Sequence, residues 1–191
     1  MISGAVRDAL IARYGEPHRR YHALAHIEDC LTQVRASTDL TAAQRDLLET
    51  AIWFHDAIYD PTRNDNEAAS ADLAREQLSA DGADPGFIAE IERLILLTAG
   101  HSVGDGDALG ARLVSIDLSI LGAEPARYDA YARAIREAYA HVPEPFSRAG
   151  RAAIMGRFLE NPALYADPVW AERYEAQARA NIAREIAELR A

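Results

Sequence analysis

Residues 47–59 constrain the fold most strongly, because their apolar side chains recur at helical spacing. Two adjoining stripes run along this stretch: Leu48, Ile52, His55 and Tyr59, and beside them Leu47, Ala51, Phe54 and Ile58. His55 is therefore expected among core-facing residues, with Asp56 next to it. Burial of an unpaired carboxylate costs several kcal/mol, which is a large part of a domain's stability. A divalent metal ion, a salt bridge or a helix cap could compensate the charge of Asp56.

The rest of the chain also favours helices, and we expect an all-α fold. Ala, Leu, Glu and Arg dominate the composition, and no segment shows a sustained alternation of apolar and polar residues. Start and stop signals predict helices over about residues 4–14, 24–37, 41–59, 65–79, 85–98, 108–121, 126–140, 146–160 and 169–189. The length of 191 residues predicts one domain, residues 1–191. Its ligand-bearing core would span about residues 21–122 and a C-terminal helical cover about residues 123–191.

The charge balance and the cysteine content narrow the possible partners. The chain has 20 Lys and Arg residues against 30 Asp and Glu residues, a formal charge of -10. This charge opposes binding to duplex nucleic acid and to anionic membranes. Cys30 is the only cysteine, the N-terminal residues lack the pattern of a signal peptide, and no apolar run approaches the roughly 18 residues of a membrane span. We therefore expect a soluble, cytoplasmic protein with no membrane partner.

Other polar residues also lie beside apolar helical positions. His22 and His26 are four residues apart and could share a metal ion, but Ala23 stands where a zinc protease of the HExxH type requires Glu. For His26 alone, a hydrogen-bonded histidine between helices is an alternative. Asp117 lies on the predicted inner face of the helix over residues 108–121. A metal ion, a pairing Arg or the cap of a neighbouring helix could explain this carboxylate.

Together these residues form an ordered set: His26, the pair His55–Asp56, His101 and Asp117. Around them stand the strings YHALAH (21–26), WFHDAIYDP (53–61), NDNE (64–67) and DLSILG (117–122). This order of residues and the surrounding sequence strings resemble the HD superfamily of metal-dependent phosphohydrolases, in particular a subfamily of predicted HD phosphohydrolases. The resemblance covers nearly the whole chain. The resemblance implies a single-domain HD-type helical bundle that holds a divalent metal ion, one of Mn, Fe, Co, Ni, Zn or Mg. The implied metal ligands are His26, His55, Asp56 and Asp117.

The chemistry of this ligand set suggests further roles. The metal ion would lower the pKa of a bound water and polarise a phosphoryl oxygen of a nucleotide or another small phosphoester. Asp60 or Glu67 could take the proton from the water, although Glu67 could instead form a capping box with Asn64. In two-metal members of the HD superfamily, additional histidines between the His-Asp pair and the last Asp bind a second ion. Here His101 is the only histidine in that interval, so the resemblance implies one metal ion, with His101 binding phosphate or donating a proton. The residues expected near the substrate are Arg19, Arg20, His22 and Arg63.

Two other functions are compatible with parts of this pattern. Some HD-fold proteins are oxygenases with a di-iron centre, which requires more His ligands than the sequence offers. A non-catalytic domain that is stabilised by metal, or that senses a nucleotide, would also use such a helical bundle. Turnover of an aryl phosphate would separate the phosphohydrolase from the sensing domain, and iron content with an absorption band would identify the oxygenase.

Overall fold

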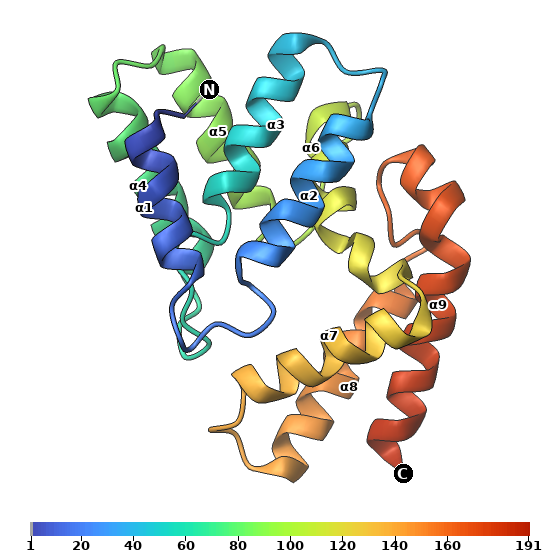
Figure 1. Ribbon diagram of the computed structural model, residues 1–191. Coiled ribbons are helices and arrows are strands. Elements are labelled where there is room, and N and C mark those ends of the chain that lie inside the picture. Colours follow the sequence, from blue (N-terminus) through green and yellow to red (C-terminus); the bar gives the residue numbers. More distant parts are fainter. Residues whose placement is uncertain (1) are drawn as a thin grey trace. The chain divides into compact units, whose positions relative to one another are not determined.

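The computed structural model describes residues 2–191, and this part of the chain contains helices but no strand (Figure 1). The predicted all-α fold is confirmed. The α-helices are α1 (Gly4–Tyr14), α2 (Leu24–Ala36), α3 (Ala42–Phe54), α4 (Asn66–Ala80), α5 (Pro85–Leu97), α6 (Ala108–Asp117), α7 (Pro125–Ala138), α8 (Glu144–Glu160) and α9 (Pro168–Arg190). A 3-10 helix, η1 (Leu118–Gly122), follows α6 directly.

The chain divides into two compact units, Met1–Val114 and Ser115–Ala191. The first unit contains α1 to α5 and most of α6, and the second contains the last turn of α6, η1 and α7 to α9. The division falls inside α6, before the boundary predicted near residue 122. The prediction of a single domain over residues 1–191 stays a prediction.

Helix α3 is the central helix of the first unit, because it contacts α1, α2, α4 and α5. The predicted inner face of this helix is confirmed. Leu48, Ala51 and Phe54 are fully buried. His55, which caps the end of the helix, is 3 % exposed. The helix begins with the predicted capping box, in which the Thr41 side chain accepts from the Gln44 N–H and the Gln44 side chain accepts from the Thr41 N–H.

Helix α3 ends earlier than predicted. Helical spacing predicted continuation to about Tyr59, but α3 ends at Phe54. The reason is that side chains from elsewhere in the unit take over the backbone carbonyls at this end. The Tyr14 hydroxyl donates to the Trp53 carbonyl at 3.0 Å, and Arg19 donates to the carbonyls that follow. A carbonyl that is satisfied by a side chain no longer needs the helix to continue.

The start of α4 corrects another prediction, the capping box of Asn64 with Glu67. The N-cap of α4 is Asp65, and its carboxylate forms an ion pair with Arg63 instead of capping the helix. The Nε atom of Arg63 lies 2.8 Å from Oδ1 of Asp65. Glu67 lies in the first turn of α4, where a negative charge is favourable beside the positive end of the helix dipole.

In the second unit, the backbone tightens from α6 into η1, where sequence periodicity predicted an α-helix to Leu121. The Tyr165 hydroxyl donates to the Leu118 carbonyl at 3.2 Å, and the Asn181 amide donates to the Leu121 carbonyl at 2.9 Å. Gly122 permits this approach, because a Cβ atom there would lie 2.6 Å from Cβ of Tyr174. These contacts hold η1 against α9.

The long helix α9 packs on α8 and η1, and α7 also contacts η1. Between α7, α8 and α9 lies a buried polar cluster, in which the Glu185 carboxylate accepts hydrogen bonds from the Tyr128 hydroxyl and from Arg151. Across residues 2–191, every helix is too short or too polar to cross a membrane.

Candidate metal centre

Three side chains of the first unit meet below the end of α3. His26 projects from α2, His55 caps α3, and Asp56 follows directly. Their ligand atoms lie close together: Nε2 of His26 is 3.3 Å from Nε2 of His55, and Oδ2 of Asp56 is 3.1 Å from His55 Nε2 and 3.7 Å from His26 Nε2. Both imidazoles are buried, at 4 % and 3 % exposure. The structure therefore brings together three of the four predicted metal ligands.

The orientation of the His55 ring determines which nitrogen can bind a cation. Its Nδ1 atom lies 2.9 Å from the Ile52 carbonyl oxygen. Since a carbonyl oxygen can only accept, Nδ1 carries the proton and donates it to Ile52. Neutral His55 therefore has its lone pair on Nε2, the atom that faces His26 and Asp56. A hydrogen bond from the distal ring nitrogen to a backbone carbonyl is the usual support of a metal-binding histidine.

The Asp56 carboxylate has an unusual environment. Its Oδ2 atom is buried and makes no hydrogen bond within the described part of the chain, although His55 Nε2 is 3.1 Å away. Burial raises the pKa of the Asp56 carboxyl, but the positive charge that the surrounding imidazoles carry when protonated, His55 foremost, lowers it more. The pKa of Asp56 thus lies well below its usual range. A buried carboxylate oxygen beside two imidazoles needs a compensating positive charge, carried either by protons on the imidazoles or by a metal ion.

The spacing of the three atoms fits a metal ion. Two ligands about 2.1 Å from an ion, at angles of about 90 to 110 degrees, are about 3.0 to 3.4 Å apart. The observed separations of 3.1, 3.3 and 3.7 Å are close to this range. The site in the first unit is therefore a candidate metal centre with nitrogen and oxygen ligands.

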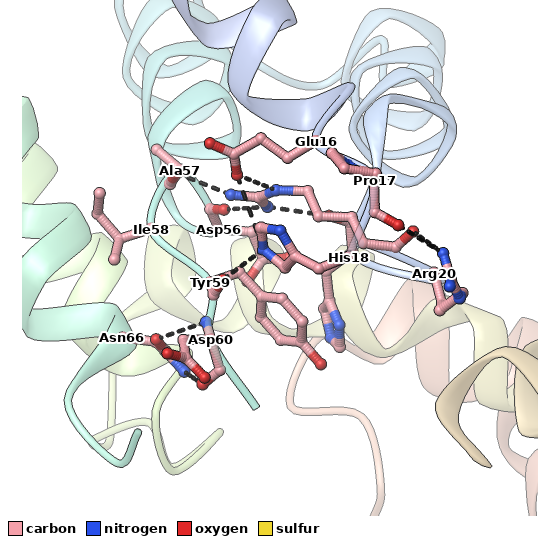
Figure 2. Close-up of polar contacts among 12 residues, drawn as sticks. Glu16, Pro17, His18, Arg20, Asp56, Ala57, Ile58, Tyr59, Asp60 and Asn66 are labelled. Atoms are coloured by element: carbon pink, nitrogen blue, oxygen red, sulfur yellow. Dashed lines mark hydrogen bonds and ion pairs between the residues drawn. The ribbon is translucent and has the colours of Figure 1, made fainter. Parts of the chain in front are cut away.

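The backbone that carries Asp56 leaves α3 as an irregular segment, and side chains satisfy its carbonyls one after another (Figure 2). Arg19 donates to the carbonyls of Asp56 and Ala57, at 2.7 and 2.9 Å. His18 Nε2 lies 2.9 Å from the Tyr59 carbonyl oxygen. Because buried carbonyls need donors, these contacts are what allow the chain to leave the helix at this point.

Two residues of α4 bind the same segment from another side. The Asn66 side chain accepts from the Asp60 N–H at 3.0 Å and donates to the Asp60 carbonyl at 2.9 Å (Figure 2). One helical turn later, the buried Ser70 hydroxyl pairs in the same way with the N–H and the carbonyl of Ile58. Sequence reasoning missed both residues. The available signal was their spacing of four, which puts two polar side chains on one face of α4.

Arg19 was predicted to bind substrate, and the structure gives it a different role. Its side chain is 1 % exposed, and it donates to backbone carbonyls and to the Glu16 carboxylate. A guanidinium that is buried and committed to these acceptors is not available to a phosphate. Arg63 was also predicted to contact substrate, but it pairs with Asp65 in the structure.

Asp60 was predicted as a general base. Its Oδ1 atom accepts from the Thr62 hydroxyl at 2.7 Å and from the Thr62 N–H at 2.8 Å, which closes a local turn. The hydrogen bond from the Thr62 hydroxyl lowers the pKa of Asp60, and the one from the N–H lowers it further. A lower pKa makes a weaker base, so this environment disfavours the predicted role. Glu67 is half-buried in the first turn of α4, and its catalytic role stays a prediction.

The remaining candidates occupy distinct places in the first unit. The ring of His22 stacks on Tyr59 at a centroid distance of 4.3 Å. Arg20 is exposed and donates to the Pro17 carbonyl at 2.7 Å. His101 adopts a left-handed backbone conformation with φ of 50°, and its N–H donates to the Leu97 carbonyl at the end of α5. Their predicted roles in substrate binding and catalysis stay predictions.

Asp117, the fourth predicted ligand, is the last residue of α6 and is half-buried. It belongs to the second unit. Its convergence with the three ligands of the first unit therefore stays a prediction.

The ligand atoms also restrict the metal. Imidazole nitrogen together with carboxylate oxygen suits Mn, Fe, Co, Ni, Zn or Mg and disfavours Cu(I), which prefers sulfur. Cys30 is close to the site, but its Sγ lies 3.8 and 3.9 Å from the two ring nitrogens of His26, as a packing neighbour does. The case for a metal centre stands on these residues alone: comparisons of the chain with family models, with curated proteins and with solved structures return no match.

Proposed function

We propose that this protein is a metal-dependent phosphohydrolase that acts on a nucleotide or another small phosphoester. The observation that carries the proposal is the buried cluster of His26, His55 and Asp56, whose ligand atoms face one another at 3.1 to 3.7 Å. The order of these residues along the chain, which resembles that of HD phosphohydrolases, selects phosphoester hydrolysis among the reactions of metal enzymes.

Asp117 is the proposed fourth ligand. Asp117 is the last residue of α6, and its carboxylate would add a second anionic oxygen ligand, as the resemblance to HD phosphohydrolases implies. A second carboxylate would lower the net charge of a divalent site to zero. We propose one metal ion, because His101 is the only histidine between the His-Asp pair and Asp117.

The chain's own residues have defined tasks in this proposal. When bound, the metal ion supplies an activated water and polarises a phosphoryl oxygen. His55 keeps its Nε2 lone pair in place through the bond from Nδ1 to Ile52. His22 and Arg20 are the proposed contacts for the substrate, and Glu67 or His101 the proposed group that moves a proton. With a charge of -10, the chain favours a small substrate over a polyanion, and we place the reaction in the cytoplasm.

The test is elemental analysis of the purified protein, followed by a screen of aryl phosphates and nucleotides with added Mn²⁺, Ni²⁺, Co²⁺, Zn²⁺ and Mg²⁺. We expect metal-dependent release of phosphate. Asp117→Asn should abolish this activity and weaken metal binding while circular dichroism shows unchanged helix content, because the substitution keeps the shape of the side chain and removes an anionic ligand.

Three results would contradict the proposal. Full activity and normal metal content in Asp117→Asn would make this carboxylate a structural residue. Bound metal without turnover of any phosphoester would indicate a non-catalytic domain. Bound iron with a visible absorption band and oxygen-dependent turnover would indicate an oxygenase.

A further inference from the structure

We infer that Arg19 is a positioning residue of the metal centre, which holds the two ligand-bearing segments of the first unit at their working distance. The inference rests on the proposed metal function. It assigns to Arg19 a task through His26 and His55, and no contact with the substrate.

The hydrogen bonds of Arg19 join the segment that enters α2 to the segment that leaves α3. One nitrogen, Nη1, donates to the His22 carbonyl at 3.0 Å and to the Asp56 carbonyl at 2.7 Å. The second, Nη2, donates to the Ala57 carbonyl at 2.9 Å. His22 precedes His26 by four residues, just before α2 begins, and Asp56 is itself a proposed ligand. A single guanidinium therefore connects the backbones that carry both halves of the site.

The surroundings of Arg19 hold the guanidinium rigidly. Its Nε atom donates to Glu16 at 3.2 Å, and its side chain is 1 % exposed. The guanidinium carbon lies 5.0 Å from the centre of the Tyr14 ring and 5.8 Å from that of the Tyr59 ring. The planar fork of an arginine can donate in these directions at the same time, whereas the ammonium of a lysine is a compact point charge.

The connection made by Arg19 matters because a metal site tolerates only small changes in the positions of its ligand atoms. The imidazoles of His26 and His55 come from different helices, and their Nε2 atoms must stay about 3 Å apart to share an ion. A functional site requires its groups within about 0.5 Å of the productive geometry. The entry to α2 has Ala23 as its N-cap, which offers no capping side chain. Arg19 supplies the missing fixation for this end of α2.

Arg45 provides a matched control for an experiment. Like Arg19, it is an arginine of the first unit that donates to backbone carbonyls, in this case those of Val34 at 2.6 Å and Ser37 at 2.8 Å. These carbonyls lie at the opposite end of α2 from the metal centre. Arg19→Lys and Arg45→Lys therefore make the same chemical change at two ends of one helix.

The experiment is a titration of the full-length wild type, Arg19→Lys and Arg45→Lys with Co²⁺, followed by the visible absorption of the bound ion. Thermal unfolding by circular dichroism is recorded for the same samples. We expect both variants to unfold at a lower temperature than the wild type. Only Arg19→Lys should bind Co²⁺ about 10- to 100-fold more weakly and change the absorption band, as the loss of a residue that orients metal ligands does.

Each outcome decides the inference. Arg19→Lys with wild-type affinity and spectrum would overturn it, and so would an equal loss of affinity in Arg45→Lys, which would show a general effect of stability. If Arg19→Lys does not fold in buffer, all three proteins are titrated with trimethylamine N-oxide, which favours the folded state. A wild type that does not bind Co²⁺ would overturn the proposed metal function itself, and this result is visible before any variant is measured.

Discussion

Each unit of this protein buries a carboxylate, and the two carboxylates are treated in opposite ways. In the second unit, Glu185 is 8 % exposed and its oxygens accept from the Tyr128 hydroxyl and from Arg151, whose Nε lies 2.9 Å away. In the first unit, the buried Oδ2 of Asp56 faces two imidazole nitrogens and makes no hydrogen bond to any described residue.

The difference distinguishes a structural carboxylate from the carboxylate that we propose as a metal ligand. The oxygens of Glu185 accept hydrogen bonds from the donors that surround them. Burial and the hydrogen bond to Glu185 raise the pKa of Tyr128 far above its usual range. Around Asp56, the neighbouring groups are two imidazoles, and the compensating positive charge comes either from their protons or from a bound metal ion. A complete hydrogen-bond network stabilises a fold, whereas a buried polar atom without a hydrogen-bond partner requires another explanation, such as a bound ion.

The largest expected effect comes from Asp56→Asn. This variant should lose metal affinity by more than about 100-fold and lose metal-dependent phosphatase activity, because an anionic ligand is removed. The apoprotein should keep its stability or gain some, since a buried charge disappears. Metal content, turnover and thermal unfolding measured on one preparation check this. If the Asn variant is unstable but binds metal normally, Asp56 is a structural carboxylate like Glu185 and not a metal ligand.

Glu185→Gln makes the same change in the other unit and should have the reverse effect. Removal of the charge leaves the buried Arg151 guanidinium without its anion, and breaking a buried ion pair costs about 3 to 5 kcal/mol of unfolding free energy. Metal affinity should not change. Chemical denaturation gives the free energy, and Co²⁺ titration gives the affinity. A loss of affinity comparable to that of Asp56→Asn would show that the two clusters are not independent.

Ser70→Ala should have an intermediate effect on stability. Its fully buried hydroxyl accepts from the N–H of Ile58 and donates to the carbonyl of Ile58. Removal of the hydroxyl should therefore lower the free energy of unfolding by about 1 to 3 kcal/mol. Ser79→Ala, at an exposed position of the same helix, is the control and should change stability by less than about 0.5 kcal/mol. Equal stability of the two variants in chemical denaturation would mean that the segment after α3 does not depend on α4.

The smallest expected effect concerns a paired carboxylate of the first unit, Asp107. Burial raises its pKa, but hydrogen bonds from Arg93 and from the Gly110 N–H lower it more, so the pKa of folded Asp107 is below its usual value. Its contribution to stability is then present above the unfolded pKa of about 3.9 and is lost as the pH falls through the folded pKa. The part-exposed pair should contribute less than about 1 kcal/mol.

The measurement for Asp107 is the unfolding midpoint of the wild type and of Asp107→Asn at neutral and at acid pH. The difference between the two proteins should shrink on acidification. A difference that stays constant with pH would mean that the carboxylate has the same pKa in the folded and unfolded chain.

Helices with local start signals could be predicted from the sequence, because their determinants are close in the chain. Asp84 with Pro85 predicted the start of α5, and Asp84 accepts from the N–H groups of Gly86 and Phe87 as expected. The capping box of Thr41 with Gln44 was confirmed for the same reason. The capping box of Asn64 with Glu67 was wrong, because the N-cap of α4 is Asp65, one residue later, and the Asp65 carboxylate pairs with Arg63. A local pattern does not tell which of two neighbouring residues takes the N-cap position.

For the candidate site, the sequence by itself determined that His55 is buried, because His55 lies on the same face as the apolar stripe of α3, which packs in the core. It did not determine where α3 ends or what Arg19 does. Those were decided by tertiary structure: donors as distant as 41 residues along the chain reach the carbonyls after Phe54 and replace the helical hydrogen bonds there. Which acceptor a donor finds depends on the packing of separate helices, and periodicity within one helix carries no information about it.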